Sequence, residues 1–395
     1  MHHVERSGAL TAPQGPGTPR EKLLNPLFQH HPSLEAHLPH LALGTYPSAI
    51  QRLGGLERAC DASALYLKRD DAADPTYGGN KLRKLEYLLA EAKANGARKV
   101  MTFGAVGSNH ALATAIHAKR LGLGAISMLV PQVLSSKVCR NLLAHHLAGA
   151  EMHHYPDEQA LGDAVRYQLD RHERMDGIAP TVVPGGGTSA LGAVGFVAAG
   201  FELANQVAAG ELHAPARIYM AFGTTGTAAG LAVGLRAAGL DCEVVAVRVT
   251  AERFGNEKRM RTLIRQTSSL LHERSGGSFP TLGPQDCRVT VRHDCFGGEY
   301  ARYTPPAIEA VRRTYESDGV VLEGTYTGKA MLALQKDLQD PRVAGQPSLF
   351  WNTYNSRPLA IDGIDYRQLP SVFHRYFEQP MQALDAQMEA VFGNR

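Results

Sequence analysis

The chain has 395 residues, of which 44% are hydrophobic, and it carries 41 Lys and Arg against 38 Asp and Glu. This apolar fraction excludes a chain that is disordered as a whole, and the length predicts two domains with large cores. A formal net charge of +3 with no long Lys/Arg block excludes the electrostatic footprint of a nucleic-acid or membrane-surface partner, so we expect a small-molecule partner.

The N-terminal region holds three Pro and three Gly within residues 7–20 and predicts a disordered tail over residues 1–20. It lacks the apolar core of a signal peptide, and no apolar run approaches the roughly 18 to 20 residues that span a bilayer. The five cysteines are scattered with no CxxC pair, which favours a reducing compartment. We therefore expect a cytoplasmic protein that inserts into no membrane.

From residue 64 onward, short β-rich runs alternate with helix-like stretches, a pattern typical of parallel sheets with crossover helices. The expected strands are residues 65–68, 100–103, 125–130, 182–184, 218–222, 244–249, 320–322 and 349–351. Apolar residues at helical spacing predict helices over residues 81–94, 110–121 and 381–392. The predicted fold class is α/β.

One lysine stands out by its position. Lys81 follows the pair Gly78-Gly79 after one residue and begins a predicted helix. The positive helix N-terminus and the nearby Arg83 and Lys84 disfavour its ammonium form, so we expect a lowered pKa and a nucleophilic amine suited to Schiff-base chemistry. A solvated surface lysine is the alternative.

Two strand-to-helix turns could meet a ligand. In the first, residues 104–111, the backbone N–H groups and the side chains of Ser108 and Asn109 can meet a carboxylate or an aromatic oxygen. In the second, residues 222–231, glycines and threonines enter an Ala-rich helix in the form of a phosphate cradle. It lacks the ending of a nucleotide P-loop. An ordinary capped helix and a tight turn without ligand are the respective alternatives.

Several motifs occur together and in order: KRDD at 68–71, GGNKLRKLE at 78–86, SN at 108–109, PGGGTSALGAVGF at 184–196, the Gly/Thr loop, and TYTGKA at 325–330. The chain thereby resembles the pyridoxal-phosphate enzymes of the 1-aminocyclopropane-1-carboxylate deaminase and D-cysteine desulfhydrase family, from Pro47 to Pro358. The resemblance implies a tryptophan-synthase-β-like fold, with two open, mostly parallel sheets flanked by helices and the cofactor in the cleft between two domains. The large domain would comprise residues 21–83 and 196–395, the small domain residues 84–195, and the protein would be a homodimer.

The resemblance also implies roles for individual residues. Lys81 matches the lysine that binds pyridoxal 5'-phosphate covalently, and Lys84 matches a lysine near its phosphate. The other implied cofactor ligands are Asn109, Thr224, Thr225, Gly226, Thr227 and Thr353. The implied catalytic groups are Lys81, Ser108, Tyr300 and Tyr326, and the implied substrate ligands are Ser108, Asn109, His110 and Thr327.

The residue after Tyr326 distinguishes activities within the family. Ring-opening deaminases carry Glu there, whereas desulfhydrase-type members carry a small hydroxyl residue, as this chain does with Thr327. The resemblance therefore implies β-elimination from a small amino acid such as D-cysteine. β-Replacement by the same residues is one alternative. A silent ligand-binding descendant is another, suggested by Tyr354 and Asn355 in place of the usual Gly-Gly.

Other departures from the family pattern are Gly107 in place of glutamine and Glu323-Gly324 in place of Asp-Pro. They surround the implied substrate rather than the phosphate. The adjacent histidine pairs at 30–31, 145–146 and 153–154 are interpreted as structural or surface groups and not as a metal site, because neighbouring side chains diverge and no third ligand is placed by spacing.

Overall fold

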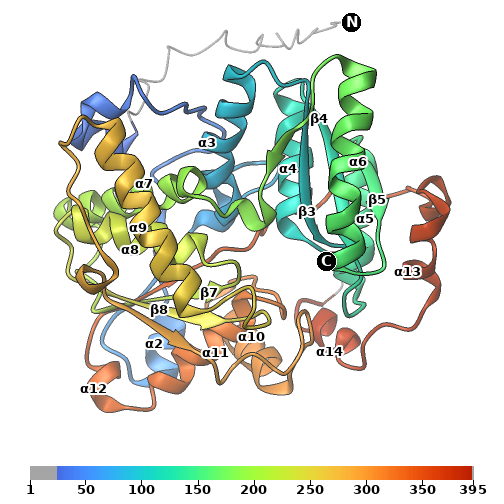
Figure 1. Ribbon diagram of the computed structural model, residues 1–395. Helices are drawn as coiled ribbons and strands as arrows, with labels where there is room; N and C mark the ends of the chain where they lie inside the picture. Colours follow the sequence, from blue (N-terminus) through green and yellow to red (C-terminus); the bar gives the residue numbers. More distant parts are fainter. Residues whose placement is uncertain (1–24, 394–395) are drawn as a thin grey trace, which may run out of the picture.

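Two open sheets form the framework of the protein. The computed structural model describes residues 25–393 (Figure 1), so the predicted tail over residues 1–20 lies outside the described part. The larger sheet has the strand order β1-β2-β10-β7-β8-β9, and the smaller has the order β5-β4-β3-β6. All pairings are parallel except that of β1 with β2. The structure therefore confirms the predicted α/β class.

The bounds of the strands and helices are as follows. The strands are β1 (Ile50–Arg52), β2 (Leu65–Lys68), β3 (Lys99–Ala105), β4 (Gly124–Val130), β5 (Glu151–His154), β6 (Thr181–Val183), β7 (Arg217–Phe222), β8 (Glu243–Arg248), β9 (Val289–Arg292) and β10 (Ser348–Trp351). The helices are α1 (Pro26–His30), α2 (Gly54–Cys60), α3 (Asn80–Ala94), α4 (Asn109–Arg120), α5 (Ser136–Leu147), α6 (Glu158–Asp176), α7 (Ala190–Ala208), α8 (Gly226–Ala237), α9 (Glu257–Arg274), α10 (Pro305–Asp318), α11 (Thr327–Asp337), α12 (Pro341–Ala344), α13 (Arg375–Glu378) and α14 (Asp385–Ala390).

One expected strand is absent. Residues 320–322 lead from α10 to α11 without joining either sheet. Val320 and Leu322 are buried against the helices on one face of the larger sheet, so their hydrophobicity reflects packing and not strand pairing. Strands β1, β5 and β9 were not predicted from the sequence. Each lies at the edge of a sheet and is only partly buried, so it lacks the continuous apolar run of a central parallel strand.

The larger sheet is covered on both faces. Side chains of α7, α8 and α9 pack on one face, and those of α2, α10 and α11 pack on the other. Contrary to expectation, α7 is long and apolar enough to cross a membrane by length and composition. In the structure, 72% of that stretch is buried, and the helix packs against α8 and α3 as a core helix.

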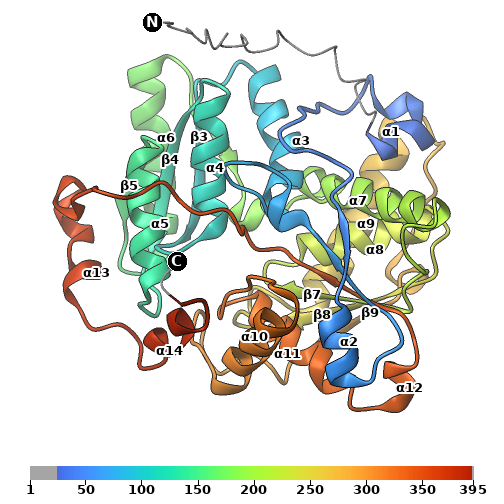
Figure 2. The same ribbon diagram turned by 180° about the vertical axis from the view of Figure 1, so that it is seen from behind.

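Helices also cover both faces of the smaller sheet. Figure 1 shows α6 in front of this sheet, and Figure 2 shows α4 and α5 on its opposite face. Its strands all lie within residues 84–195, the range expected for the small domain. The expected boundaries at 83/84 and 195/196 fall inside α3 and α7, which pack against each other.

The C-terminal segment links the two halves. After β10 it crosses to α13 beside the smaller sheet and returns to α14 near α10 (Figure 2). Leu369, Phe373 and Tyr376 pack into the core of the smaller half, whereas Met388 of α14 packs into that of the larger half. The helix expected over residues 381–392 is therefore shorter, at α14 alone.

Candidate active site

A cavity lies at the carboxyl ends of strands from both sheets, where open α/β folds place their ligands. About 490 Å³ of space lies within it, including space that is open to solvent. It is lined by Asn80, Lys81, Lys84, Asn109, residues 221–228, Glu323, Tyr326, Thr353 and Tyr354. The structure thus brings together most of the residues that the sequence analysis assigned to one site.

Lys81 lies in the first turn of α3, and its side chain lines this cavity. The helix begins there because Gly79 adopts a φ of +92°, where a Cβ atom would approach the carbonyl oxygens of Thr353 and Tyr354 to 2.9 Å. Within residues 25–393, the Lys81 amine has no hydrogen-bond or ion-pair partner. It is therefore free to react with a carbonyl group.

The expected lowering of the Lys81 pKa is found, but its cause differs from the one predicted. Burial alone lowers the pKa of Lys81 to about 8. Arg83 contributes no net repulsion because its guanidinium turns away from the cavity and pairs with Asp70 at 2.7 Å and with Glu202 at 2.9 Å. Sequence spacing placed this charge near Lys81 but could not show that it is neutralised.

Lys84 lies one turn further along α3 and is fully buried. Its Nζ donates to the carbonyl oxygen of Gly186 at 3.0 Å. Burial, together with the nearby Lys81, holds the pKa of Lys84 well below its usual range. An anion bound beside this amine would favour its charged form, as a phosphate-binding role requires.

The expected phosphate loop joins β7 to α8. Thr225 has a φ of +75°, a left-handed conformation that is rare and strained for a β-branched residue. Within the described residues, no side chain caps the start of α8, so the first N–H groups of this helix point into the cavity region without a side-chain acceptor. An uncapped helix N-terminus provides donors and a positive dipole for an anion.

Thr224 is fixed by a neighbouring turn. Its Oγ1 lies 2.7 Å from Oγ1 of Thr188. Gly186 has a φ of +68°, and a Cβ at that position would come within 2.1 Å of Thr224 Oγ1. Asn80 holds the far end of the loop by donating to Thr227 Oγ1 at 3.0 Å. The glycine-rich run at 184–187 therefore shapes the phosphate loop from outside.

Of the three predicted site residues at the start of α4, one lines the cavity and two make contacts within the surrounding structure. Asn109 lines the cavity. Ser108, expected to meet the substrate, does not line it and instead caps α4, its Oγ accepting from the N–H of Ala111 at 3.2 Å. His110 lies buried beneath the glycine-rich run, where its Nε2 accepts from the N–H of Gly187 at 3.2 Å. Burial holds its pKa well below the usual range, so the ring is neutral.

Tyr326 and Tyr300 form a hydrogen-bonded pair through their hydroxyl groups. Tyr326 lines the cavity, and Tyr300 reaches the cavity only through this contact. Burial raises the pKa of Tyr300 to about 12 and holds the pKa of Tyr326 well above its usual value, so both hydroxyls keep their protons. Tyr326 can therefore present a proton to a group in the cavity.

Glu323, which was expected near the substrate but was given no role, lines the cavity beside Tyr326. Its carboxylate accepts from the N–H groups of Tyr326 at 2.6 Å and Thr327 at 2.9 Å. Thr327 does not line the cavity, because its side chain is buried and its Oγ1 accepts from the N–H of Glu323. The only signal in the sequence was the departure from Asp-Pro at this position.

The segment after β10 contributes two more residues to the lining of the cavity. Thr353 and Tyr354 both line the cavity. Neither Tyr354 nor Asn355 has a positive φ, so replacement of the usual glycines imposes no backbone strain. Asn355 binds the start of α3, its Oδ1 accepting from the N–H of Gly78 at 2.9 Å. Of the two residues that replace the usual glycines, only Tyr354 adds side-chain bulk to the cavity lining.

Comparison with known proteins agrees with this geometry. The family model described as pyridoxal-phosphate dependent enzyme matches residues 41–353. The chain belongs to this family.

Two curated relatives and one solved structure are similar to this chain over most of its length. The nocardicin C-9' epimerase of Nocardia uniformis subsp. tsuyamanensis is 34% identical, covering 81% of this chain and 94% of the relative. The D-cysteine desulfhydrase of Yersinia pestis is 33% identical, covering 73% and 86%. A crystal structure of an ACC deaminase homologue matches with a TM-score of 0.69 at 31% identity, covering 82% of this chain and 94% of that one.

The cavity holds residues that fit pyridoxal phosphate, the cofactor of this family. The free Lys81 amine has a lowered pKa, the start of α8 is uncapped, and the buried Lys84 amine lies where a Cβ on Gly226 would approach it to 3.0 Å. Lys81 would hold the aldehyde carbon, while Lys84 and the 224–227 loop would hold the phosphate. Asn109 and Thr353 remain the candidates for contacts with the ring.

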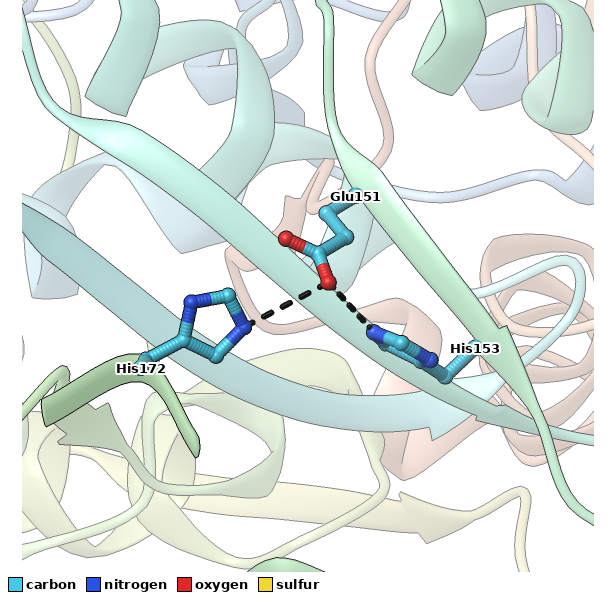
Figure 3. Close-up of side chains that lie close together, drawn as sticks. All are labelled: Glu151, His153 and His172. Carbon is cyan, nitrogen blue, oxygen red and sulfur yellow. Dashed lines mark hydrogen bonds and ion pairs between the residues drawn. The ribbon is translucent and has the colours of Figure 1, made fainter. Parts of the chain in front are cut away.

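A separate cluster in the smaller half joins β5 to α6 (Figure 3). Glu151, His153 and His172 have potential ligand atoms within 4.8 Å of one another. Sequence spacing had placed no third group beside His153. Two cations already contact the cluster, since Arg171 donates to Glu151 at 2.6 Å and Lys99 lies 3.2 Å from His172 Nδ1. These charges would repel a metal ion, so we interpret the cluster as a structural network.

Proposed function

We propose that this protein is a lyase that catalyses β-elimination from a small amino acid, in which the amino acid and one water molecule yield a 2-oxo acid, ammonia and the protonated leaving group. The observation that carries the proposal is the placement of Lys81 and Tyr326 on one cavity beside the uncapped start of α8. The desulfhydrase relative and the small hydroxyl residue at position 327 support elimination.

The chain supplies two proton-handling groups to this reaction. Pyridoxal phosphate, when bound, withdraws electrons from the Cα atom of an amino acid. Lys81, with a pKa of about 8, is suited to take the proton from Cα near neutral pH. Tyr326 keeps its proton and donates it to the leaving group as the Cβ bond breaks, while Tyr300 hydrogen-bonds to the resulting oxygen.

The side-chain amide of Asn109 would orient the substrate. Asn109, the first residue of α4, faces the cavity, and its Oδ1 is approached by Tyr77 and by Asn141 at 3.4 Å each. Tyr77 and Asn141 are buried, whereas Asn109 is partly exposed. These two contacts would hold the Asn109 amide in place at the cavity.

The test is a screen of D- and L-amino acids with Cβ leaving groups, read by absorbance of the cofactor and by 2-oxo acid formation. We expect a yellow protein that releases a 2-oxo acid from at least one of them, and an inactive, colourless Lys81→Ala variant. Addition of an external thiol with a new amino acid as product would instead identify β-replacement. A change in optical rotation without 2-oxo acid would identify epimerisation, the activity named in one relative.

The silent ligand-binding alternative makes a different prediction. A yellow protein with an unchanged spectrum in every amino acid of the screen would support it and contradict the lyase proposal. The intact Lys81, placed in the cavity with a lowered pKa, favours the lyase.

We further propose that the enzyme works in the cytoplasm as a homodimer. All five cysteines are free, which suits a reducing compartment. Exposed apolar side chains on α6 and the edge strand β6, namely Tyr167, Met175 and Val182, offer a surface for self-association. Sedimentation analysis of the wild-type protein and a Tyr167→Glu variant tests the dimer.

A further inference from the structure

Tyr354 presents an aromatic ring to the amino-acid end of the cavity. It lines the cavity together with Tyr326 and Asn109, the residues nearest to where the substrate is proposed to bind. The family pattern has glycine at this position, which would leave that volume open. The ring therefore makes the cavity shorter on the side that would receive the substrate's side chain.

A buried cation holds this ring. The Nζ atom of Lys137, a residue of α5, lies 4.4 Å from the centre of the Tyr354 ring and 5.7 Å from that of Tyr326. A cation at this distance from an aromatic face attracts it, more strongly where water is excluded. The side chain of Lys137 is only 8% exposed. The contact therefore restricts movement of the ring out of the cavity wall.

Glu323 in turn holds the cation. Its Oε2 lies 3.0 Å from Lys137 Nζ, so the pair joins the smaller half of the protein to the larger half beside the cavity. Glu323 cannot move freely, because its carboxylate also accepts from the N–H groups of Thr325 and Tyr326. Tyr354, Lys137 and Glu323 are together called the Tyr354 wall. Each of the three is held in position by at least one of the others.

The helix that carries Lys137 is itself fastened by the C-terminal segment. Ser136 Oγ donates to Asp385 at 2.6 Å, and Arg140 pairs with Glu389 at 2.7 Å. Asp385 and Glu389 belong to α14, beyond residue 353 where the match to the family model ends. A segment outside the family model therefore fixes the position of α5.

We propose that Tyr354, held by Lys137, is a specificity-determining residue that limits the substrate to amino acids with a short side chain. The inference rests on the proposed function and names its substrate class: an amino acid with a short side chain fits, and a longer side chain meets the ring. A well-packed interior resists added atoms. One extra or missing methylene in a hydrophobic pocket changes the ratio of kcat/KM between two substrates by roughly 10- to 200-fold. One aromatic ring in the path of the side chain is therefore sufficient to disfavour longer substrates.

The experiment compares the binding of two amino acids that lack a leaving group. The cofactor-loaded protein is titrated with alanine and with norleucine, each as both enantiomers, and the change in cofactor absorbance gives a dissociation constant for each ligand, compared between the two amino acids of the same configuration. We expect alanine to bind at least tenfold more tightly in the wild-type protein. Tyr354→Ala should reduce this ratio at least tenfold by strengthening the binding of norleucine.

Two further variants distinguish the effect of the ring on binding from an effect on folding. Tyr354→Phe keeps the ring and its contact with Lys137, so the ratio should stay within about threefold of the wild-type ratio. Lys137→Met would leave Glu323 as an unpaired buried charge, so it is combined with Glu323→Gln. The double variant frees the ring and should give an intermediate ratio, with folding checked by circular dichroism.

The two proposals fail in different ways. A wild-type spectrum that responds to neither amino acid contradicts the lyase proposal and this inference with it. A wild-type protein that binds alanine, with a ratio unchanged in Tyr354→Ala, contradicts the specificity role alone. An equal loss of both affinities in the folded Tyr354→Ala variant also contradicts it.

Discussion

The guanidinium of Arg83 and the carboxylate of Glu202 lie 2.9 Å apart in the protein interior, where they fasten α3 to α7. Lys68 pairs with the same carboxylate at 2.6 Å, and Asp70 pairs with Arg83 at 2.7 Å. The two positive and two negative charges compensate each other. Since Lys81 lies two residues before Arg83, this network fixes the helix that presents the reactive amine to the cavity.

Glu202→Gln should destabilise the protein by about 3–5 kcal/mol, because it leaves the buried Lys68 and Arg83 with one carboxylate between them. The measurement is the free energy of unfolding from urea denaturation. Glu309→Gln is the matched control: its carboxylate pairs with Arg312 on the surface and is 47% exposed, so the cost should stay below about 1 kcal/mol. Equal effects of the two substitutions would contradict the role of the network.

The Glu202 carboxylate should also determine how the free energy of unfolding changes at acid pH. The pKa of Glu202 is lowered to about 2, and burial, which opposes this shift, is outweighed by Arg83 and Lys68. Its unfolded-state pKa is about 4.3. The stabilisation is therefore complete above the unfolded value and is lost as the pH falls from about 4 to 2. Over this range, Glu202→Gln should bind about one proton fewer on unfolding, as measured by the slope of stability against pH.

The lowered pKa of Lys81 has a kinetic consequence. Only the neutral amine attacks a carbonyl group, so the rate at which the apoprotein forms its covalent link to pyridoxal phosphate should rise with pH and level off above about 8. A solvent-exposed lysine would level off near its usual pKa of about 10.4. Stopped-flow absorbance measures the rate. A midpoint near 10, or a chromophore that persists in Lys81→Ala, would contradict the assignment.

The glycine-rich run should affect phosphate binding without touching the phosphate. Gly186→Ala places a Cβ 2.1 Å from Thr224 Oγ1 and should displace the loop. Loss of one charge-assisted hydrogen bond costs about 1.5–3 kcal/mol, so the affinity for pyridoxal phosphate should fall roughly 10- to 100-fold. The affinity for unphosphorylated pyridoxal should remain nearly unchanged.

Gly210→Ala is the matched control for this substitution. Gly210 has a φ of +76°, close to that of Gly186, but no atom of residues 25–393 lies within 4 Å of an added Cβ. Both variants carry the same backbone strain, and only Gly186→Ala disturbs Thr224. A similar loss of cofactor affinity in both variants would show that strain, and not the contact, is responsible.

The sequence predicted the central elements well because buried parallel strands are apolar throughout. β2, β7 and β10 were found within one residue, whereas β1, β5 and β9 were missed because edge strands are partly polar. The placement of Lys81 and of the 224–227 turn on one cavity was also predictable, since glycines and threonines at a strand-to-helix turn carry their own conformational signature.

Side-chain direction was less predictable than position. Ser108 and Thr327 stand at helix starts, where a hydroxyl group can serve either a ligand or the backbone, and in both cases it serves the backbone. Lys137 lies far from the motifs in sequence and reaches Tyr354 only through the packing of α5. Nothing in its local sequence distinguishes it from a surface lysine.

The hydroxyl of Tyr326 should be required for breaking the Cβ bond and not for binding. Tyr326→Phe removes the proton donor and keeps the ring, so turnover by β-elimination should fall about 10²- to 10⁴-fold. Spectral binding of alanine and exchange of its Cα hydrogen with deuterated water should continue, because both precede departure of the leaving group. Tyr300→Phe should have a smaller effect, since Tyr300 acts only through its hydrogen bond to Tyr326. Equal turnover by Tyr326→Phe and the wild-type protein would show that another group or water protonates the leaving group.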